Sequence, residues 1–204
     1  MLIRIHPETP ARRQIFQIVD ILREGGVIIY PTDTVYGIGC DIFNQKAVER
    51  VARIKGIKPE NANFSFICYD LSHISDFTRH FDNHIFKMMK KYLPGPFTFI
   101  LPANNNIPKL FKNKKKTVGI RIPKHNIPLE IVKELGNPLL TTSLHDSDTL
   151  LDYTTDPELI QENLGYLVDA VIDGGYGHNT PSTILDCTGN EITILRQGLG
   201  IFEE

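Results

Sequence analysis

The chain reads Pro31-Thr-Asp-Thr-Val-Tyr-Gly-Ile-Gly-Cys-Asp41 directly after the apolar run Val27-Ile-Ile-Tyr30. An apolar run that ends at a proline is typical of a buried strand that opens into a loop. Small polar side chains at such a strand end can contact a ligand, and glycines let the backbone approach it closely. The stretch therefore predicts one wall of a ligand site, with an ordinary strand-to-loop turn as the alternative.

Length and composition bound the class of protein. The chain has 204 residues, of which 41% are hydrophobic and 23% charged, which predicts one globular domain spanning residues 1–204. No apolar run approaches the roughly 20 residues of a membrane helix, and the N-terminus lacks the apolar core of a signal peptide, so we expect a cytoplasmic protein without membrane contact. The three cysteines, Cys40, Cys68 and Cys187, lie in or beside apolar runs and are expected to be reduced core thiols. No metal-ligand spacing occurs, and no metal site is predicted.

Strand-like and helical patterns alternate along the chain. Thr9-Pro10 predicts a helix start, and Asn44 predicts the N-cap of a second helix. Further helices are expected over 72–80, 83–92, 126–135 and 156–164, and strands over 27–30, 64–69, 97–101, 117–122, 138–143, 167–172, 182–186 and 191–196. The last two strands flank Thr188-Gly-Asn190 and predict a hairpin. Several strands follow each other too closely for parallel crossovers, so we expect an α/β fold on a twisted mixed parallel and antiparallel sheet with flanking helices.

Charge is segregated along the chain although the net charge is only −2. The stretch 83–129 contains no acidic residue, whereas 130–204 contains fourteen acids beside Lys133 and Arg196. Such segregation indicates that the middle of the chain faces an anion, either a nucleotide or a nucleic-acid backbone. The candidate RNA-binding residues are Lys112, Lys114, Lys115 and Lys116. A solvated lysine-rich face is the alternative for this cluster.

Familiar nucleotide-binding loops are missing from the sequence, which contains neither a GxxxxGK[ST] motif nor a GxGxxG motif after a strand. Polar residues instead gather at expected strand ends: Thr32, Asp33, Thr34, Tyr36, Lys55, Lys58, Thr117, Arg121, Thr141, Thr142, Ser143, His145, Ser182, Thr183 and Arg196. Strand ends are where α/β sheets bind ligands, and donors with cations suit an anionic substrate in phosphoryl or nucleotidyl transfer. Each residue also has a structural alternative, such as a β-branched strand former or a solvated helix end. Isolated histidines such as His73, His80 and His84 are expected on helix surfaces.

Five segments together resemble one known family. They are Pro31–Gly39, Leu93–Leu101, Thr117–Pro123, Thr141–Ser143 and Pro181–Ile184 followed by Ile194–Gly198. In this order they resemble the YrdC/YciO family over nearly the whole chain. The resemblance implies the YrdC/RibB-like fold and L-threonylcarbamoyladenylate synthesis from L-threonine, bicarbonate and ATP, with release of pyrophosphate. That product serves the threonylcarbamoyladenosine modification of tRNA, and double-stranded RNA binding is also attributed to the family.

The resemblance also implies roles for individual residues. The residues that it implies for binding the substrate L-threonine are Thr32, Thr34, Tyr36, Arg121, Thr141 and Ser182, with Arg121 holding the carboxylate. The residues that it implies for binding ATP are Lys55, Lys58, Thr117, Ser143 and Arg196. The catalytic residues that it implies are Lys55, Lys58, Arg121 and Ser143. Threonine and bicarbonate would form a carbamate that attacks the α-phosphorus, while Mg²⁺ accompanies ATP and no cofactor is permanently bound.

Two positions depart from the synthase pattern. Lys55-Gly-Ile-Lys58-Pro stands where synthases carry Lys-x-Arg-Pro, so the arginine position is taken by Ile57 or, if one residue is inserted, by Lys58. Ser143-Leu-His145 stands where synthases carry Ser-x-Asn. Lysine cannot reproduce the bidentate fork of arginine on phosphate. These departures resemble the YciO branch more than the YrdC branch, and a chain ending at Glu204 is expected to lack the additional domain of longer synthases. Two functions therefore stay open, a threonylcarbamoyl-AMP synthase and a non-catalytic or weakly active RNA-binding protein of the same fold.

Overall fold

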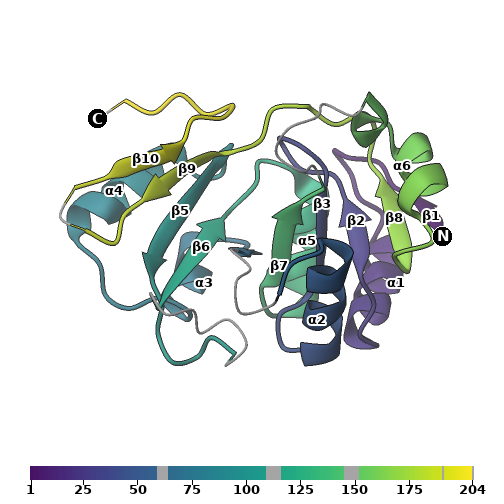
Figure 1. Cartoon of the computed structure of the whole chain (residues 1–204), viewed down its shortest axis with the longest axis horizontal. Helices are drawn as coiled ribbons and strands as arrows, with labels where there is room; N and C mark the ends of the chain where they lie inside the picture. The colour runs from purple at the N-terminus through teal and green to yellow at the C-terminus, as the bar shows by residue number, and fades with distance from the viewer. Residues whose placement is uncertain (59–63, 109–115, 145–151, 190, 204) are drawn as a thin grey trace.

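The computed structural model describes residues 1–58, 64–108, 116–144, 152–189 and 191–203. Within these residues ten strands form one sheet in the order β1-β8-β2-β3-β7-β4-β6-β5-β9-β10 (Figure 1). The strands are β1 (Leu2–Arg4), β2 (Ile28–Tyr30), β3 (Gly37–Asp41), β4 (Ser65–Ile67), β5 (Phe97–Pro102), β6 (Thr117–Arg121), β7 (Leu139–Ser143), β8 (Ala170–Asp173), β9 (Thr183–Asp186) and β10 (Thr193–Arg196). The helices are α1 (Arg12–Arg23), α2 (Gln45–Ile54), α3 (Leu71–Ser75), α4 (Asn83–Tyr92), α5 (Asn126–Leu135) and α6 (Pro157–Leu164), with a 3-10 turn, η3, at Asp152–Thr155.

The sheet is mixed, as predicted from the short connections. Its parallel pairs are β1–β8, β2–β8, β4–β6 and β5–β9. Its antiparallel pairs are β2–β3, β3–β7, β4–β7, β5–β6 and β9–β10. The predicted C-terminal hairpin is confirmed by the last of these pairs. The two chain ends lie at opposite ends of the sheet, the N-terminus beside β1 and the C-terminus near β10 (Figure 1).

The central strands β2, β3 and β8 are buried on both faces, which explains their continuous apolar runs, whereas β10 is exposed along its length. In β2, Ile28 and Tyr30 belong to a core that includes apolar residues of α1 and α5, whereas Ile29 belongs to the larger core on the other face. Successive strand residues point to opposite faces, so a run without polar positions is what two cores require. The three predicted core thiols are confirmed as buried and free, and burial raises the pKa of each. No helix in the described ranges is long and apolar enough to cross a membrane.

Several local expectations are wrong. Helix α1 begins at Arg12 with Ala11 in the cap position and no side-chain cap, because the amide and hydroxyl of Thr9 contact His6 Nδ1 at 3.2 Å instead. The predicted strand at 167–172 begins only at Ala170, and the helix expected over 72–80 ends at Ser75. Strands β1 and β3 were not expected. His73, expected on a surface, is 5% exposed.

The predicted cap of α2 is confirmed and gives a direct test. The Asn44 side-chain oxygen accepts a hydrogen bond from the amide of Ala47 at 3.1 Å, which satisfies an otherwise unpaired donor of the first helical turn. Asn44→Ala is expected to lower the free energy of unfolding by about 1 kcal/mol in urea denaturation. Asn44→Asp keeps the acceptor and is the control. An equal loss in both variants would contradict the capping role.

Burial of His73 predicts a loss of stability at mildly acidic pH. Its ring stacks on Tyr69 at 4.5 Å and meets Phe77 edge-on at 5.6 Å, and its buried Nδ1 has no partner among the described residues. Burial lowers the pKa of His73 from its ordinary value of 6.5. The unfolded chain therefore binds a proton here as the pH falls below that value while the folded chain does not, so the free energy of unfolding falls with pH.

We expect His73→Leu to flatten this pH dependence. The slope attributable to one proton is at most about 1.4 kcal/mol per pH unit. The measurement compares urea midpoints of wild type and variant at several pH values from neutral to mildly acidic. His80→Leu, at an exposed histidine, is the matched control. His125, whose pKa burial also lowers, keeps part of the slope in the variant. Identical slopes in wild type and His73→Leu would contradict the prediction.

Candidate functional site

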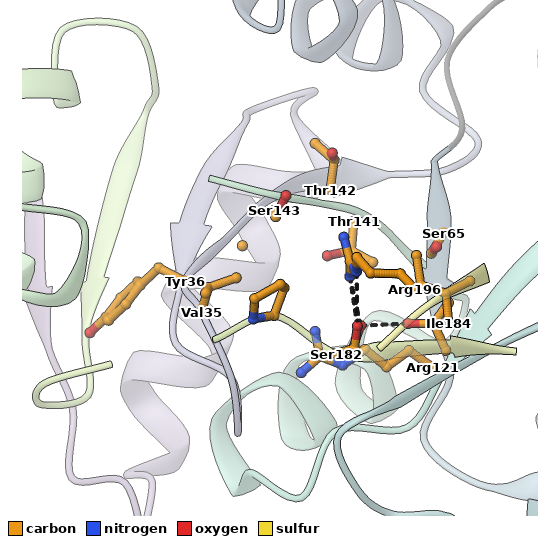
Figure 2. A pocket seen from close by; sticks show the side chains of 13 residues that line it. Val35, Tyr36, Ser65, Arg121, Thr141, Thr142, Ser143, Ser182, Ile184 and Arg196 are labelled. Carbon is orange, nitrogen blue, oxygen red and sulfur yellow. Dashed lines mark hydrogen bonds between the residues drawn. The ribbon is translucent and has the colours of Figure 1, made fainter. Parts of the chain in front are cut away.

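A cavity of about 120 Å³ lies at the ends of strands from both halves of the sheet (Figure 2). Its lining is hydroxyl-rich and contains two arginines but no carboxylate among the described residues. The lining residues are Val35, Tyr36, Gly37, Ser65, Thr98, Arg121, Thr141, Thr142, Ser143, Pro181, Ser182, Ile184 and Arg196. Hydrogen-bond donors and positive charge therefore dominate the wall, which suits an anionic ligand.

Arg121 is the best-held cation of the site. It ends β6, is 7% exposed, and its Nη2 donates to Asp33 Oδ1 at 2.5 Å and Thr34 Oγ1 at 2.7 Å. The same nitrogen lies 3.1 Å from Thr32 Oγ1. Asp33 is held in turn by the amide of Lys124, which donates to Oδ2 at 3.0 Å. The loop at 31–36 thus closes around Nη2 of the guanidinium and fixes its orientation.

One nitrogen of the Arg121 guanidinium has no partner in the protein. Its Nε is buried, and it has no hydrogen-bond partner among the described residues. A buried donor without a partner is costly, and in native structures it commonly marks an absent ligand or water. Because Arg121 lines the cavity, this orphan donor supports an anion that binds its guanidinium.

Arg196 supplies the second guanidinium. Its Nη2 and Nε donate to the carbonyl oxygen of Ser182 at 2.8 and 3.1 Å, which anchors the hairpin strand β10 to the segment before β9 (Figure 2). Burial lowers the pKa of Arg196, and the nearby charge of Arg121 lowers it further. Two guanidiniums that repel each other across one cavity are stabilised when an anion lies between them. The Ser182 hydroxyl in turn lies 2.9 Å from Thr98 Oγ1.

The glycines of the 31–41 stretch make room for neighbouring parts of the protein. A Cβ on Gly39 would lie 2.0 Å from the carbonyl oxygen of Leu140 and 3.1 Å from the Tyr30 ring. Gly37 lines the cavity, but a Cβ there would lie 3.1 Å from the same ring. The glycines therefore admit the Tyr30 ring, and Gly39 also admits strand β7. The ring places the Tyr30 hydroxyl 2.6 Å from Thr141 Oγ1, to which it donates.

The structure brings together most of the predicted threonine-side residues. Arg121, Thr141 and Ser182 line the cavity, and Thr32 and Thr34 hold Arg121. Tyr36 lines it too, but its ring points away from Arg196 and Ser182 in Figure 2, and its hydroxyl donates to the carbonyl of Gly175 at 2.7 Å.

The predicted ATP-side and RNA-side residues are more dispersed. Ser143 and Arg196 line the cavity, whereas Lys55, Lys58 and Thr117 are not among its lining residues. Lys55 is the C-cap of α2, and Lys58 and Lys116 are exposed. His145, Lys112, Lys114 and Lys115 lie outside the described residues.

Two lining residues were not singled out from the sequence. Ser65 begins β4 and Thr98 is the second residue of β5. The alternation of apolar and polar positions around Thr98 was the available signal, because a threonine between two buried phenylalanines points to the opposite face of the sheet from them. Ser65 carried no such signal, since its neighbours on the wall come from distant strands.

Comparisons with known proteins find relatives over most of the chain. A family model described as "Telomere recombination", for Sua5, YciO and YrdC proteins, matches residues 20–198. The chain is 41% identical over 198 residues to the uncharacterised protein YciO of Escherichia coli K12, covering 96% of this chain and 94% of that one. It is 32% identical over 194 residues to threonylcarbamoyl-AMP synthase of Bacillus subtilis, covering 94% of this chain but only 55% of the synthase.

Two solved structures are similar over almost the whole chain. The crystal structure of E. coli YciO superposes with a TM-score of 0.90 at 39% identity, covering 98% of this chain and 97% of that one. P. abyssi Sua5, solved in complex with L-threonine, superposes with a TM-score of 0.87 at 25% identity, covering 97% of this chain and 57% of Sua5. The chain therefore belongs to the Sua5/YciO/YrdC family.

Proposed function

We propose that this protein binds L-threonine in the described cavity and is a threonylcarbamoyl-AMP synthase. It would join L-threonine, bicarbonate and ATP to form threonylcarbamoyl-AMP and pyrophosphate for tRNA modification. The observation that carries the proposal is Arg121, a cavity-lining guanidinium that Asp33 and Thr34 hold through Nη2 and whose buried Nε has no partner among the described residues. A carboxylate is the ligand group that a fixed guanidinium in a hydroxyl-lined cavity fits. Named synthases among the relatives, and a relative solved with L-threonine, support the same substrate.

Each part of the cavity has a role in this proposal. Arg121 orients the amino-acid carboxylate, with Asp33 preventing the guanidinium from rotating. The hydroxyls of Thr141 and Ser182 hold the rest of the amino acid. Arg196 faces the same space and would stabilise negative charge that develops as the α-phosphorus is attacked. Lys55, Lys58, Thr117 and Ser143 are proposed for the nucleotide.

Magnesium would enter with the nucleotide in this proposal. No group of three or more His, Cys, Asp or Glu side chains able to hold a metal ion occurs in the described ranges, and the cavity wall there offers hydroxyls and guanidiniums. Such a wall fits a Mg²⁺ ion whose ligands are triphosphate oxygens and waters. When bound, the ion supplies charge neutralisation on the triphosphate.

A pyrophosphate-release assay tests the activity. We expect pyrophosphate only when L-threonine, bicarbonate and Mg-ATP are all present, and omission of each in turn is the first control. Arg121→Lys keeps the charge but loses the rigid fork, so it should lower kcat/KM by at least about tenfold. Release that does not depend on L-threonine, or that is unchanged in Arg121→Lys, would refute the assignment.

The RNA-binding alternative rests on the acid-free stretch 83–129, within which Lys87, Lys90, Lys116 and Lys124 are exposed. The affinity for duplex RNA would then fall steeply as the salt concentration rises. Lys114/Lys115/Lys116→Ala would make the slope of log affinity against log salt concentration shallower by up to about three. Arg12/Arg13/Lys133→Ala removes the same charge from exposed residues outside the stretch and is the matched control. Equal effects of the two triple variants would remove the basis of this alternative.

A further inference from the structure

Tyr30 lies directly behind the cavity wall. Its side chain is fully buried, and its ring packs across Gly37 and Gly39 of β3, the strand between β2 and β7. Its hydroxyl donates to Thr141 Oγ1 at 2.6 Å, and Thr141 is itself a lining residue. Nothing in the proposed chemistry uses this buried hydroxyl, which raises the question of what the contact does.

The direction of this hydrogen bond determines what Thr141 can offer a ligand. A threonine hydroxyl has one proton and two lone pairs, and here a lone pair is occupied by the Tyr30 proton. Among the residues that the structure describes, no acceptor takes the proton of the Thr141 hydroxyl. That proton is therefore available to the cavity. A hydroxyl that already accepts one hydrogen bond is polarised and becomes a stronger donor.

Tyr30 is suited to hold this arrangement at every pH near neutrality. Burial raises the pKa of its hydroxyl, so the group stays protonated and remains a donor. The ring cannot turn away, because it is confined against the glycines of β3. Tyr30 thus presents a fixed donor to Thr141, and Thr141 presents a fixed donor to the ligand.

We propose that Tyr30 is a positioning residue that fixes the Thr141 hydroxyl as a hydrogen-bond donor into the cavity, so that the ligand atom facing Thr141 is an oxygen acceptor and not an ammonium group. The inference rests on the proposed function only in its choice of L-threonine as first probe. It agrees with the rest of the wall, where the guanidiniums of Arg121 and Arg196 are also donors. The amino group of a bound amino acid would then face away from Thr141.

A double-mutant cycle tests the inference. Calorimetry would measure the dissociation constant of L-threonine for wild type, Tyr30→Phe, Thr141→Val and the double variant. Tyr30→Phe should weaken binding about threefold to tenfold, because one polarised hydrogen bond is lost. The double variant should bind no more weakly than Thr141→Val, since Tyr30 acts only through Thr141. Tyr92→Phe, which removes a tyrosine hydroxyl that donates to the remote Glu203 carbonyl at 2.7 Å, is the matched control and should leave affinity unchanged.

Stability and affinity must be separated. A merely structural Tyr30 would lower the melting temperature of Tyr30→Phe without changing the dissociation constant, and that result would overturn the inference. A loss of affinity that persists in the Thr141→Val background would overturn it as well. Thr141→Ser keeps the hydroxyl and is expected to restore the sensitivity to Tyr30→Phe.

Sulfate, which carries only acceptors, is a second probe that does not depend on the proposed function. Its binding can be followed through the NMR signal of the Arg121 Nε–H in the same variants. If wild type binds sulfate but not L-threonine, the proposed function fails, and the sulfate series alone decides the role of Tyr30 by the same cycle. If wild type binds neither probe, the inference is overturned too, because a cavity walled by donors must accept an anion.

Discussion

Arg121→Ala is expected to lower the free energy of unfolding by about 3–5 kcal/mol as well as to remove L-threonine binding. The reason is the carboxylate that the substitution leaves behind. Asp33 is 11% exposed at its side chain and faces Arg121 at 2.5 Å, so its charge would lose its ionic partner while remaining mostly buried. The neighbouring hydroxyls contribute less to the cost, because Thr32 donates to the carbonyl of Val35 and lies 3.2 Å from Thr34 Oγ1.

The matched variant for this prediction is Asp33→Ala/Arg121→Ala. Removing both charges leaves no buried ion, so the double variant should be more stable than Arg121→Ala alone. Both are compared by urea denaturation followed by fluorescence and circular dichroism. Neither variant should bind L-threonine. A double variant less stable than Arg121→Ala would show that the loss of stability in Arg121→Ala comes from lost packing of the arginine and not from the unpaired Asp33 carboxylate.

Elements whose ends are marked by their own residues could be predicted from the sequence. Helix α5 runs from Asn126 to Leu135 and ends at Gly136, whose φ of +83° is a conformation that glycine adopts without strain. Helix α6 begins after Asp156, whose side chain accepts from the amide of Glu158. In both cases the cap residue and the apolar spacing agree locally, so no distant contact is needed to place the helix.

Elements that depend on distant partners could not be predicted in this way. Strand β1 has only three residues and pairs in parallel with β8, at the other end of the chain. Strand β3 begins Gly-Ile-Gly, a composition that predicts a loop, and it is a strand because β2 and β7 pair with it on both sides. In helix α1 a local signal was misleading. Thr9-Pro10 predicts the start of the helix, but Thr9 contacts His6 and does not cap it.

The candidate site also had a part that local residues predicted and a part that depends on distant contacts. Donors and cations at strand ends predicted an anion site, and the strands do bring Arg121, Thr141, Ser182 and Arg196 around one cavity. Which donors remain available to a ligand could not be predicted, because that depends on pairings across the fold. Asp33 accepts a hydrogen bond from Arg121, and Thr141 Oγ1 accepts one from Tyr30, which is 111 residues away in the sequence.

Gly39→Ala is expected to be among the most damaging substitutions in the chain. A methyl group at this position would lie 2.0 Å from the Leu140 carbonyl oxygen, which belongs to the backbone of β7 and cannot rotate away. The same methyl group would press on the Tyr30 ring at 3.1 Å. Relief requires β3 and β7 to separate where Gly39 pairs with Thr141, so we expect a loss of about 3 kcal/mol or more in the free energy of unfolding.

Gly37→Ala is the matched control, since it adds the same methyl group to the same face of the same strand. Its nearest neighbours are the Tyr30 ring and Thr141 Oγ1, at 3.1 and 3.2 Å, and both are side chains that can shift by a few tenths of an ångström. We therefore expect a smaller stability loss from Gly37→Ala than from Gly39→Ala in urea denaturation. Equal losses would mean that the Tyr30 ring, and not the β7 backbone, sets the requirement for glycine. In that case adding Tyr30→Ala to Gly39→Ala should restore part of the stability. If the clash is with the Leu140 carbonyl, adding Tyr30→Ala should restore none of it.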